Sequence, residues 1–377
     1  MPMCPSLTTL AVGVVASLAT APAAATGESH PAKEWLDGLI RQAEQGLGER
    51  SIIVHYAAEE LKRYDVTEIP HLREKLKRFP EHPDHDKLRR LELFERHGPE
   101  VREYTMWYHA GEARLNLEPT PMLPGLYFDV CSTRSGGWRM SPRQLFLTGA
   151  PGTEPPSHNP RQSIAASSNE ILSFFGAGWS MLPRFKDGYE FRAGQGGTWE
   201  ATITFRVNDR VTRGRLRGTF EPASGRGRIT ESLAESADTP ASAWRETADE
   251  WAHDPVLGAE IARVVVLGMD GKPFRRLMFR RAEPLSEARF REVAATPMLT
   301  GRDPIRGEYT FTQVTDMTGA ETRYTTYDPE AGTMTHRSEG QTPRGQRQSR
   351  LTYAGWVLAA VIASTIVILR VRASRAT

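Results

Sequence analysis

Histidine and carboxylate side chains gather in one charged stretch of the chain, residues 65–100. Within it, the sequence His82-Pro-Asp-His85-Asp86 offers imidazole and carboxylate groups, which zinc accepts as ligands. His82, Asp84 and His85 are therefore candidate metal ligands. A solvated turn beside two prolines would have the same composition, and no partner motif such as HExxH accompanies the cluster. We therefore expect no metal and no other cofactor.

Three arginines alternate along one predicted strand, at Arg213, Arg215 and Arg217, so their side chains point the same way. Such a row can bind anionic lipid headgroups, and it can equally form the solvated face of a sheet. Both interpretations stay open. The formal net charge of the chain is only +2, so no overall field favours binding to nucleic acid.

Motifs of catalysis are missing from the sequence. It contains no GxSxG, no GxxxxGK[ST], no GxGxxG after a predicted strand and no CxxC. Of its two cysteines, Cys4 and Cys131, only Cys131 would remain after removal of an N-terminal signal. We therefore expect a protein that is not an enzyme and whose core is held without internal disulfides.

Bulky apolar residues alternate along residues 199–207, as on a strand with one buried face. An apolar face of this size needs a cover. The segment Ile171–Trp179 is strongly apolar and is predicted to be a helix that its glycines weaken. A cover over an apolar hollow is one interpretation, and a segment that simply fills the core is the other. The candidate ligand-binding residues are Phe174, Phe175, Trp179, Trp199, Ile203 and Phe205.

The rest of the pattern is mostly that of an antiparallel sheet with a few helices. Helices are predicted over 30–48, twice within 65–100, and over 285–294. Strands are predicted over 51–56, in successive hairpins over 103–147, over 199–207, 261–267 and 274–281, and in a last hairpin over 309–327. The polar residues 231–250 are predicted to be mainly loop.

Both ends of the chain carry apolar runs. Residues 7–18 are apolar and are followed by small residues up to Ala25, in the order of a secretory signal peptide, although no Lys or Arg precedes them. We expect cleavage after Ala25, with Ala21 or an uncleaved anchor as alternatives. Residues 351–369 contain no charge and are long enough to cross a bilayer as a helix. A sorting signal that is removed during surface attachment is the alternative for this end.

These ends predict how the chain is organised. A signal peptide covers residues 1–25, and an extracytoplasmic α+β domain covers 26–340 with a charged helical insertion at 65–100. A polar tether follows over 341–350, then a transmembrane helix over 351–369 and a basic cytoplasmic tail over 370–377. The protein is therefore expected in the cell membrane, with its large domain outside the cytoplasm.

Two stretches carry a resemblance to a known family. Residues 104–115, Tyr-Thr-Met-Trp-Tyr-His-Ala-Gly-Glu-Ala-Arg-Leu, and residues 270–277, Asp-Gly-Lys-Pro-Phe-Arg-Arg-Leu, resemble extracytoplasmic lipoprotein-carrier-like (outer-membrane lipoprotein-sorting-like) half-barrel domains. The resemblance covers residues 31–339. It implies a curved antiparallel sheet, an incomplete β-barrel, with helices covering its concave face, to which this chain adds the C-terminal transmembrane helix.

The resemblance also implies a function. Carriers of this family hold lipoprotein acyl chains in an apolar hollow, so we expect a membrane-anchored domain that binds a lipid or an acyl chain. The tether and the insertion at 65–100 depart from the soluble carriers and make free shuttling doubtful. The alternative function is an envelope sensor or scaffold that acts through contacts with other proteins. The expected partners are the bilayer and a lipid or lipoprotein, with no nucleic acid.

Overall fold

The computed structural model describes residues 30–61, 65–79, 82, 84–120, 128–149, 159–207, 210–236, 243–319 and 321–341. The chain divides into two compact units. The first unit takes Met1–Met106, Thr120–Pro124 and Ala165–Pro284, and the second takes Trp107–Pro119, Gly125–Ile164 and Leu285–Thr377. Strand β2 (Val101–His109) and helix α4 (Pro160–Ser173) contribute residues to both units.

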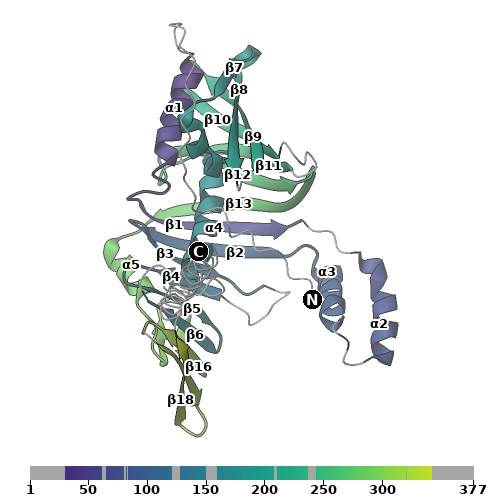
Figure 1. Ribbon diagram of the computed structural model, residues 1–377, viewed down its shortest axis with the longest axis vertical. Helices are drawn as coiled ribbons and strands as arrows, with labels where there is room; N and C mark the ends of the chain where they lie inside the picture. Colours follow the sequence, from purple (N-terminus) through teal and green to yellow (C-terminus); the bar gives the residue numbers. More distant parts are fainter. Residues whose placement is uncertain are drawn as a thin grey trace, which may run out of the picture. The chain divides into compact units, whose positions relative to one another are not determined.

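The first unit is built on one open, curved sheet (Figure 1). Its strands follow one another in the order β2-β1-β13-β12-β11-β10-β9-β8-β7. Apart from β2, their bounds are β1 (Ser51–Glu60), β7 (Glu190–Ala193), β8 (Thr198–Val207), β9 (Arg210–Glu221), β10 (Arg226–Ser236), β11 (Ala243–Asp254), β12 (Ala259–Met269) and β13 (Lys272–Pro284). From β1 to β7 every neighbouring pair is antiparallel. This agrees with the predicted curved antiparallel sheet.

One face of this sheet, the inner face, is apolar and covered. It carries Tyr56, Ala248, Val265, Leu277 and Phe279, all buried. Helix α1 (Pro31–Ala43) buries its apolar stripe, and the ring of its Trp35 lies where a side chain at Gly227 of β10 would otherwise stand. The 3-10 helix η3 (Trp179–Asp187) packs beside α1. These elements form the layer that covers the sheet.

Two further helices form a charged hairpin between β1 and β2, as predicted for the insertion. They are α2 (Ile69–Arg78), which follows a short 3-10 turn (Val66–Glu68), and α3 (His85–His97). Their apolar contact consists of Ile69, Leu72 and Leu91, with Val66 and Leu88 at its edge. The hairpin therefore has a small apolar core of its own.

The second unit contains a mixed sheet in the order β3-β4-β5-β6-β16-β17-β18. Its strands are β3 (Glu112–Leu117), β4 (Phe128–Ser132), β5 (Gly137–Ser141), β6 (Gln144–Thr148), β16 (Gln313–Met317), β17 (Glu321–Asp328) and β18 (Thr333–Gln341). Helix α5 (Glu287–Ala294) and the hairpin of β14 (Thr300–Asp303) and β15 (Gly307–Thr310) complete the unit. The core gathers Cys131, Trp138, Met140, Leu145 and Phe311.

Three predictions about secondary structure are wrong. Residues 231–250 are not mainly loop, because β10 continues to Ser236 and β11 begins at Ala243. Strand β16 pairs with β6 in parallel, so the sheet is not wholly antiparallel. The last hairpin gains a further strand, β18, from residues expected to lead into the tether. In each case polar residues take part in strand pairing, which an apolar pattern does not reveal.

The predictions for the two ends stay predictions. The signal peptide, the transmembrane helix and the cytoplasmic tail lie outside the described residues. Among the helices that are described, none is both long enough and apolar enough to cross a bilayer.

Candidate functional site

The segment Ile171–Trp179, here called the covering segment, lies on the inner face of the first unit. Helix α4 ends at Ser173, and the chain then turns before η3 begins at Trp179. Two backbone hydrogen bonds attach the segment to the sheet: Ala177 N–H donates to the Ile229 carbonyl at 3.0 Å, and the Phe174 carbonyl accepts from Ala262 N–H at 2.7 Å. The segment is therefore joined to β10 and β12, and it is a turn rather than the helix that its apolar pattern predicts.

Gly178 allows the covering segment to lie flat on the sheet. Its φ is +73°, and a Cβ atom there would stand 2.3 Å from Cβ of Ser232. Both the backbone conformation and the close approach exclude other residues at this position. The segment thus reaches the sheet because its sequence gives up a side chain at the point of contact.

The two adjacent phenylalanines of the segment have different surroundings. Phe174 is 0 % exposed, with its ring 6.1 Å from that of Tyr56 and 5.5 Å from that of Phe279. Phe175 is 9 % exposed, 5.4 Å from the ring of Trp179, and the guanidinium of Arg50 lies 4.9 Å from its ring centre. Phe174 is thus a core residue, whereas Phe175 and Trp179 lie at the rim of the cover.

The three predicted residues of β8 lie on the same inner face. Trp199 is buried, 5.8 Å from the ring of Trp35 and stacked 6.2 Å from that of Phe191. Ile203 and Phe205 are half-buried and flank Gly214, where a Cβ would lie 3.1 Å and 3.0 Å from their side chains. The structure therefore places all six candidate residues in one unit and on one side of its sheet.

Two buried indole N–H groups belong to this site. Nε1 of Trp179 and Nε1 of Trp199 have no hydrogen-bond acceptor among the described residues, although both side chains are only 3 % exposed. A buried donor normally finds an acceptor, because leaving it unpaired costs free energy. The site thus combines an apolar surface with two donors that a carbonyl oxygen could satisfy.

Two buried carboxylates hold the ends of the covering segment, and the sequence pattern does not predict either of them. Glu246 of β11 accepts hydrogen bonds from Gly178 N–H at 2.9 Å and from the Ser173 hydroxyl at 3.2 Å. Glu170 of α4 accepts from the Tyr56 hydroxyl at 2.8 Å and pairs with Arg275 at 2.6 Å. One signal was present: Glu246 alternates with Ala248 on an otherwise apolar face.

Burial sets the protonation of the Glu170 site. It raises the pKa of Glu170 above its ordinary value, and the opposing effects of Arg275 and Tyr56 do not cancel this rise. Burial and the neighbouring Glu170 also raise the pKa of Tyr56 well above its ordinary range. The carboxyl at the start of the covering segment therefore accepts a proton more readily than an exposed glutamate does.

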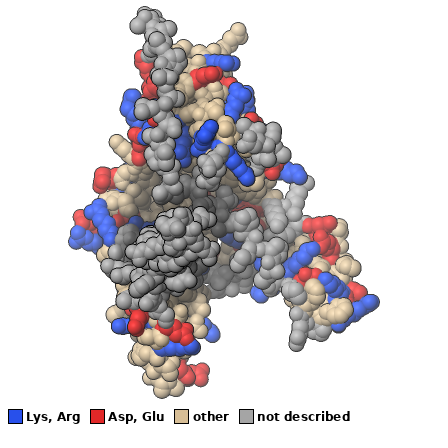
Figure 2. Space-filling model, in the orientation of Figure 1, with Lys and Arg blue, Asp and Glu red and all other residues tan. Residues whose placement is uncertain are grey.

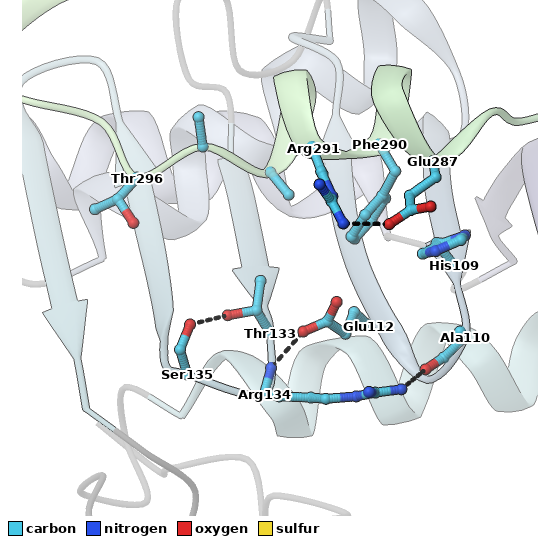
Figure 3. Close-up of a pocket in the computed structure, with 12 residues that line it drawn as sticks. His109, Ala110, Glu112, Thr133, Arg134, Ser135, Glu287, Phe290, Arg291 and Thr296 are labelled. Atoms are coloured by element: carbon cyan, nitrogen blue, oxygen red, sulfur yellow. Dashed lines mark hydrogen bonds and ion pairs between the residues drawn. The ribbon is translucent and has the colours of Figure 1, made fainter.

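A second cavity lies on the second unit, between the β2–β3 turn, the β4–β5 turn and α5 (Figure 3). Its volume is about 430 Å³. Its polar groups already pair with one another: Glu112 accepts from Arg134 N–H at 2.5 Å, the Arg134 guanidinium donates to the Ala110 carbonyl at 3.3 Å, and Arg291 pairs with Glu287. A polar cavity whose groups satisfy each other presents little that would bind a ligand specifically.

The outer face of the first unit's sheet carries a groove of about 620 Å³. Val264, Val266 and Met278 contribute to its lining, together with Arg276 and Arg280. Arg276 pairs with Glu59 and Arg280 with Glu103, each at 2.8 Å. This groove is the competing location for an apolar ligand.

The arginine row and the histidine cluster do not form dedicated sites. Arg217 pairs with Glu200 at 2.7 Å and lies 3.6 Å from Glu231, and Figure 2 shows blue and red side chains interspersed on the surface. His82 lies 3.5 Å from Asp84, which also pairs with Lys75 at 2.8 Å. No group of three or more possible metal ligands occurs within the described residues.

Cys131 is a packing residue of the second unit. It is fully buried, and burial raises the pKa of its thiol to about 12. The thiolate, which is the reactive form, is therefore scarce at neutral pH.

Comparison with known proteins identifies structural neighbours of low similarity. No family model and no curated protein matches the sequence. A LolA superfamily protein from Nitrosomonas europaea matches over 67 % of this chain and 94 % of its own, with 9 % identity and a TM-score of 0.29. A DUF1329 family protein from Desulfovibrio piger matches over 70 % of this chain and 98 % of its own, with 10 % identity and a TM-score of 0.29.

The LolA superfamily is the family that the sequence resembles, and that resemblance is confirmed. The agreement concerns the type of fold, an open curved sheet with few helices. At this TM-score no residue role and no ligand is transferred from either neighbour to this chain.

Proposed function

We propose that this protein binds an apolar ligand, such as a lipid or a lipoprotein acyl chain, on the inner face of the first unit beneath the covering segment. The observation that carries the proposal is the covering segment itself. It is an aromatic turn held to the sheet by two backbone hydrogen bonds and by two buried carboxylates. A hydrocarbon chain that replaced its aromatic rings would bury a similar apolar area, so the exchange has a small net cost.

The two unpaired indole donors extend the proposal to the polar part of the ligand. Nε1 of Trp179 and Nε1 of Trp199 would each donate to an oxygen acceptor. An ester or amide carbonyl at the head of an acyl chain is such an acceptor, whereas a pure hydrocarbon has none. The proposed ligand class is therefore an acyl ester or amide rather than a hydrocarbon, and the proposed activity is binding without catalysis.

The proposed setting follows from the sequence. We propose that residues 351–369 anchor the protein in the cell membrane and that the two units lie outside the cytoplasm, next to a supply of acylated lipids. A tethered binding domain would hold or hand over its ligand at the membrane surface instead of diffusing with it.

Photoaffinity labelling of the full-length protein in detergent tests this function. The probe is a long-chain fatty-acid ester with a diazirine on its chain, and labelled peptides are located by mass spectrometry. Labels on residues 171–187 and on β8 and β9 are expected. Labels confined to the outer groove, in β12 and β13, would contradict the proposed site, and the absence of any specific label would favour the scaffold function.

Two conservative variants test the role of the donors. Trp179→Phe and Trp199→Phe keep an aromatic ring and remove the indole N–H. Each variant should bind the ester probe roughly fivefold more weakly, the value of one hydrogen bond of about 1 kcal/mol. A hydrocarbon probe without the ester should lose less, and an equal loss for both probes would show that only ring packing matters.

A further inference from the structure

The helical hairpin of α2 and α3 presents an aromatic ring that its own core does not use. Phe79, directly after α2, is 58 % exposed, whereas the hairpin core consists of Ile69, Leu72 and Leu91. The Phe79 N–H donates to the Lys75 carbonyl at 3.1 Å, so the residue is fixed at the end of the helix. A phenylalanine held in this way at a hairpin tip is suited to contact an apolar phase.

Basic residues surround this ring in the sequence. Residues 75–90 hold six basic and three acidic side chains. The basic ones are Lys75, Lys77, Arg78, Lys87, Arg89 and Arg90, and the acidic ones are Glu81, Asp84 and Asp86. The excess of positive charge is therefore concentrated around the turn of the hairpin, although the chain as a whole is nearly neutral.

Part of this charge is not neutralised within the protein. Lys75 pairs with Asp84 at 2.8 Å, Arg78 pairs with Glu74 at 3.0 Å, and Lys87 pairs with Glu68. Lys77, Arg89 and Arg90 are exposed and have no carboxylate partner among the described residues. Figure 2 shows blue side chains along the hairpin, at the lower right of the view.

We propose that the tip of this hairpin docks onto an anionic bilayer surface. Phe79 would enter the headgroup region, where an aromatic ring beside basic side chains is stabilised. Lys77, Arg78, Arg89 and Arg90 would lie near lipid phosphates. The partner is a membrane with negative headgroups, because a neutral surface would not reward the unpaired cations. This surface is separate from the ligand site, so either proposal can fail without the other.

Fluorescence at the tip tests the proposal in the full-length protein reconstituted into liposomes. An NBD label is attached at His82→Cys in a background without Cys4 and Cys131, in phosphatidylcholine alone or mixed with phosphatidylglycerol. A blue-shifted emission is expected only when phosphatidylglycerol is present. It should weaken in high salt and when Phe79 is replaced by Ser.

Charge reversal provides the matched control. The double variant Lys77→Glu and Arg78→Glu should lower the ratio of docked to undocked hairpin roughly tenfold or more. Arg302→Glu with Arg323→Glu makes the same charge change in the second unit and should leave the emission unchanged. Emission that is the same on both kinds of liposome, or that responds equally to the two double variants, would overturn the proposal. Circular dichroism confirms that both double variants keep their helices.

Discussion

Two buried arginines, one in each unit, meet their carboxylates in different ways. In the second unit, Arg114 is 0 % exposed and binds both oxygens of Asp303 at 2.8 Å and 3.1 Å, while its Nε donates to Asp129 at 3.2 Å. In the first unit, Arg275 contacts Glu170 through one nitrogen, and its Nε has no hydrogen bond among the described residues. The second network is satisfied, and the first has capacity to spare.

The same difference appears in the carboxyl groups. Burial alone would raise the pKa of Asp303, but Arg114 and the backbone N–H groups of Arg306 and Ile305 hold it below its ordinary value. Glu170 receives no backbone N–H in its described contacts, and burial raises its pKa instead. The second unit therefore has a fixed ionic scaffold, whereas the first has an adaptable contact where the covering segment begins.

Breaking the scaffold should have the largest effect. Arg114→Met removes the cation between Asp129 and Asp303 and leaves two buried carboxylates without their partner. The free energy of unfolding should fall by about 3–5 kcal/mol, as measured by urea denaturation. Arg323→Met, at an exposed position, is the control. A loss for Arg114→Met as small as that of the control would show that the network is not needed.

The two phenylalanines of the covering segment should separate stability from binding. Phe174→Ala should lower the free energy of unfolding by about 3–5 kcal/mol, because its ring is fully buried between Tyr56 and Phe279. Phe175→Ala should cost less, because that ring lies at the rim under Arg50. Probe labelling should change in Phe175→Ala. Equal stability losses without any change in labelling would make the segment an ordinary part of the core.

Protonation of Glu170 should give a smaller effect that depends on pH. Because the folded pKa is raised above the unfolded value of about 4.3, the contribution of Glu170 to stability is greatest below that pH. It is lost as the pH rises through the folded pKa, at no more than about 1.4 kcal/mol per pH unit. Glu170→Gln should remove this decline when urea denaturation is compared between acidic and neutral pH.

Asp303 gives the opposite sign within the same experiment. Its pKa is lowered, so its contribution is present above the unfolded value and is lost as the pH falls through the folded one. Asp303→Asn should therefore lose its disadvantage toward acidic pH, whereas Glu170→Gln should lose any advantage there. A difference from the unmodified protein that does not change with pH in either variant would contradict the assignment for that residue.

The apolar parts of the fold and site could be predicted from the sequence, because they repeat with the period of a strand. Trp199, Ile203 and Phe205 alternate, and the structure places all three on the inner face. Strand β11 could not be predicted in this way, because polar residues such as Asp249, Glu250 and His253 interrupt its pattern. Strand β18 is exposed wherever its burial is described, so no apolar period marks it.

The carboxylates of the site could not be predicted, because their partners are distant in the sequence. Glu170 is defined by Tyr56 and Arg275, and Glu246 by Gly178, and only the folded sheet brings these residues together. The sequence indicates that a glutamate is present but not that it is buried. The covering segment was likewise predicted as a helix, because its apolar residues do not reveal that Gly178 adopts a positive φ.

A reversible lock on the covering segment tests the central claim most directly. A Cβ at Gly176 would lie 3.2 Å from Cβ of Ile229, close to the roughly 3.5–4.5 Å that a disulfide spans. Gly176→Cys with Ile229→Cys, in a background without Cys4 and Cys131, would fix the segment to β10. The account predicts that the oxidised protein loses labelling by the fatty-acid ester probe and that reductant restores it in the same sample. Equal labelling of the oxidised and reduced forms would contradict a ligand site beneath this segment.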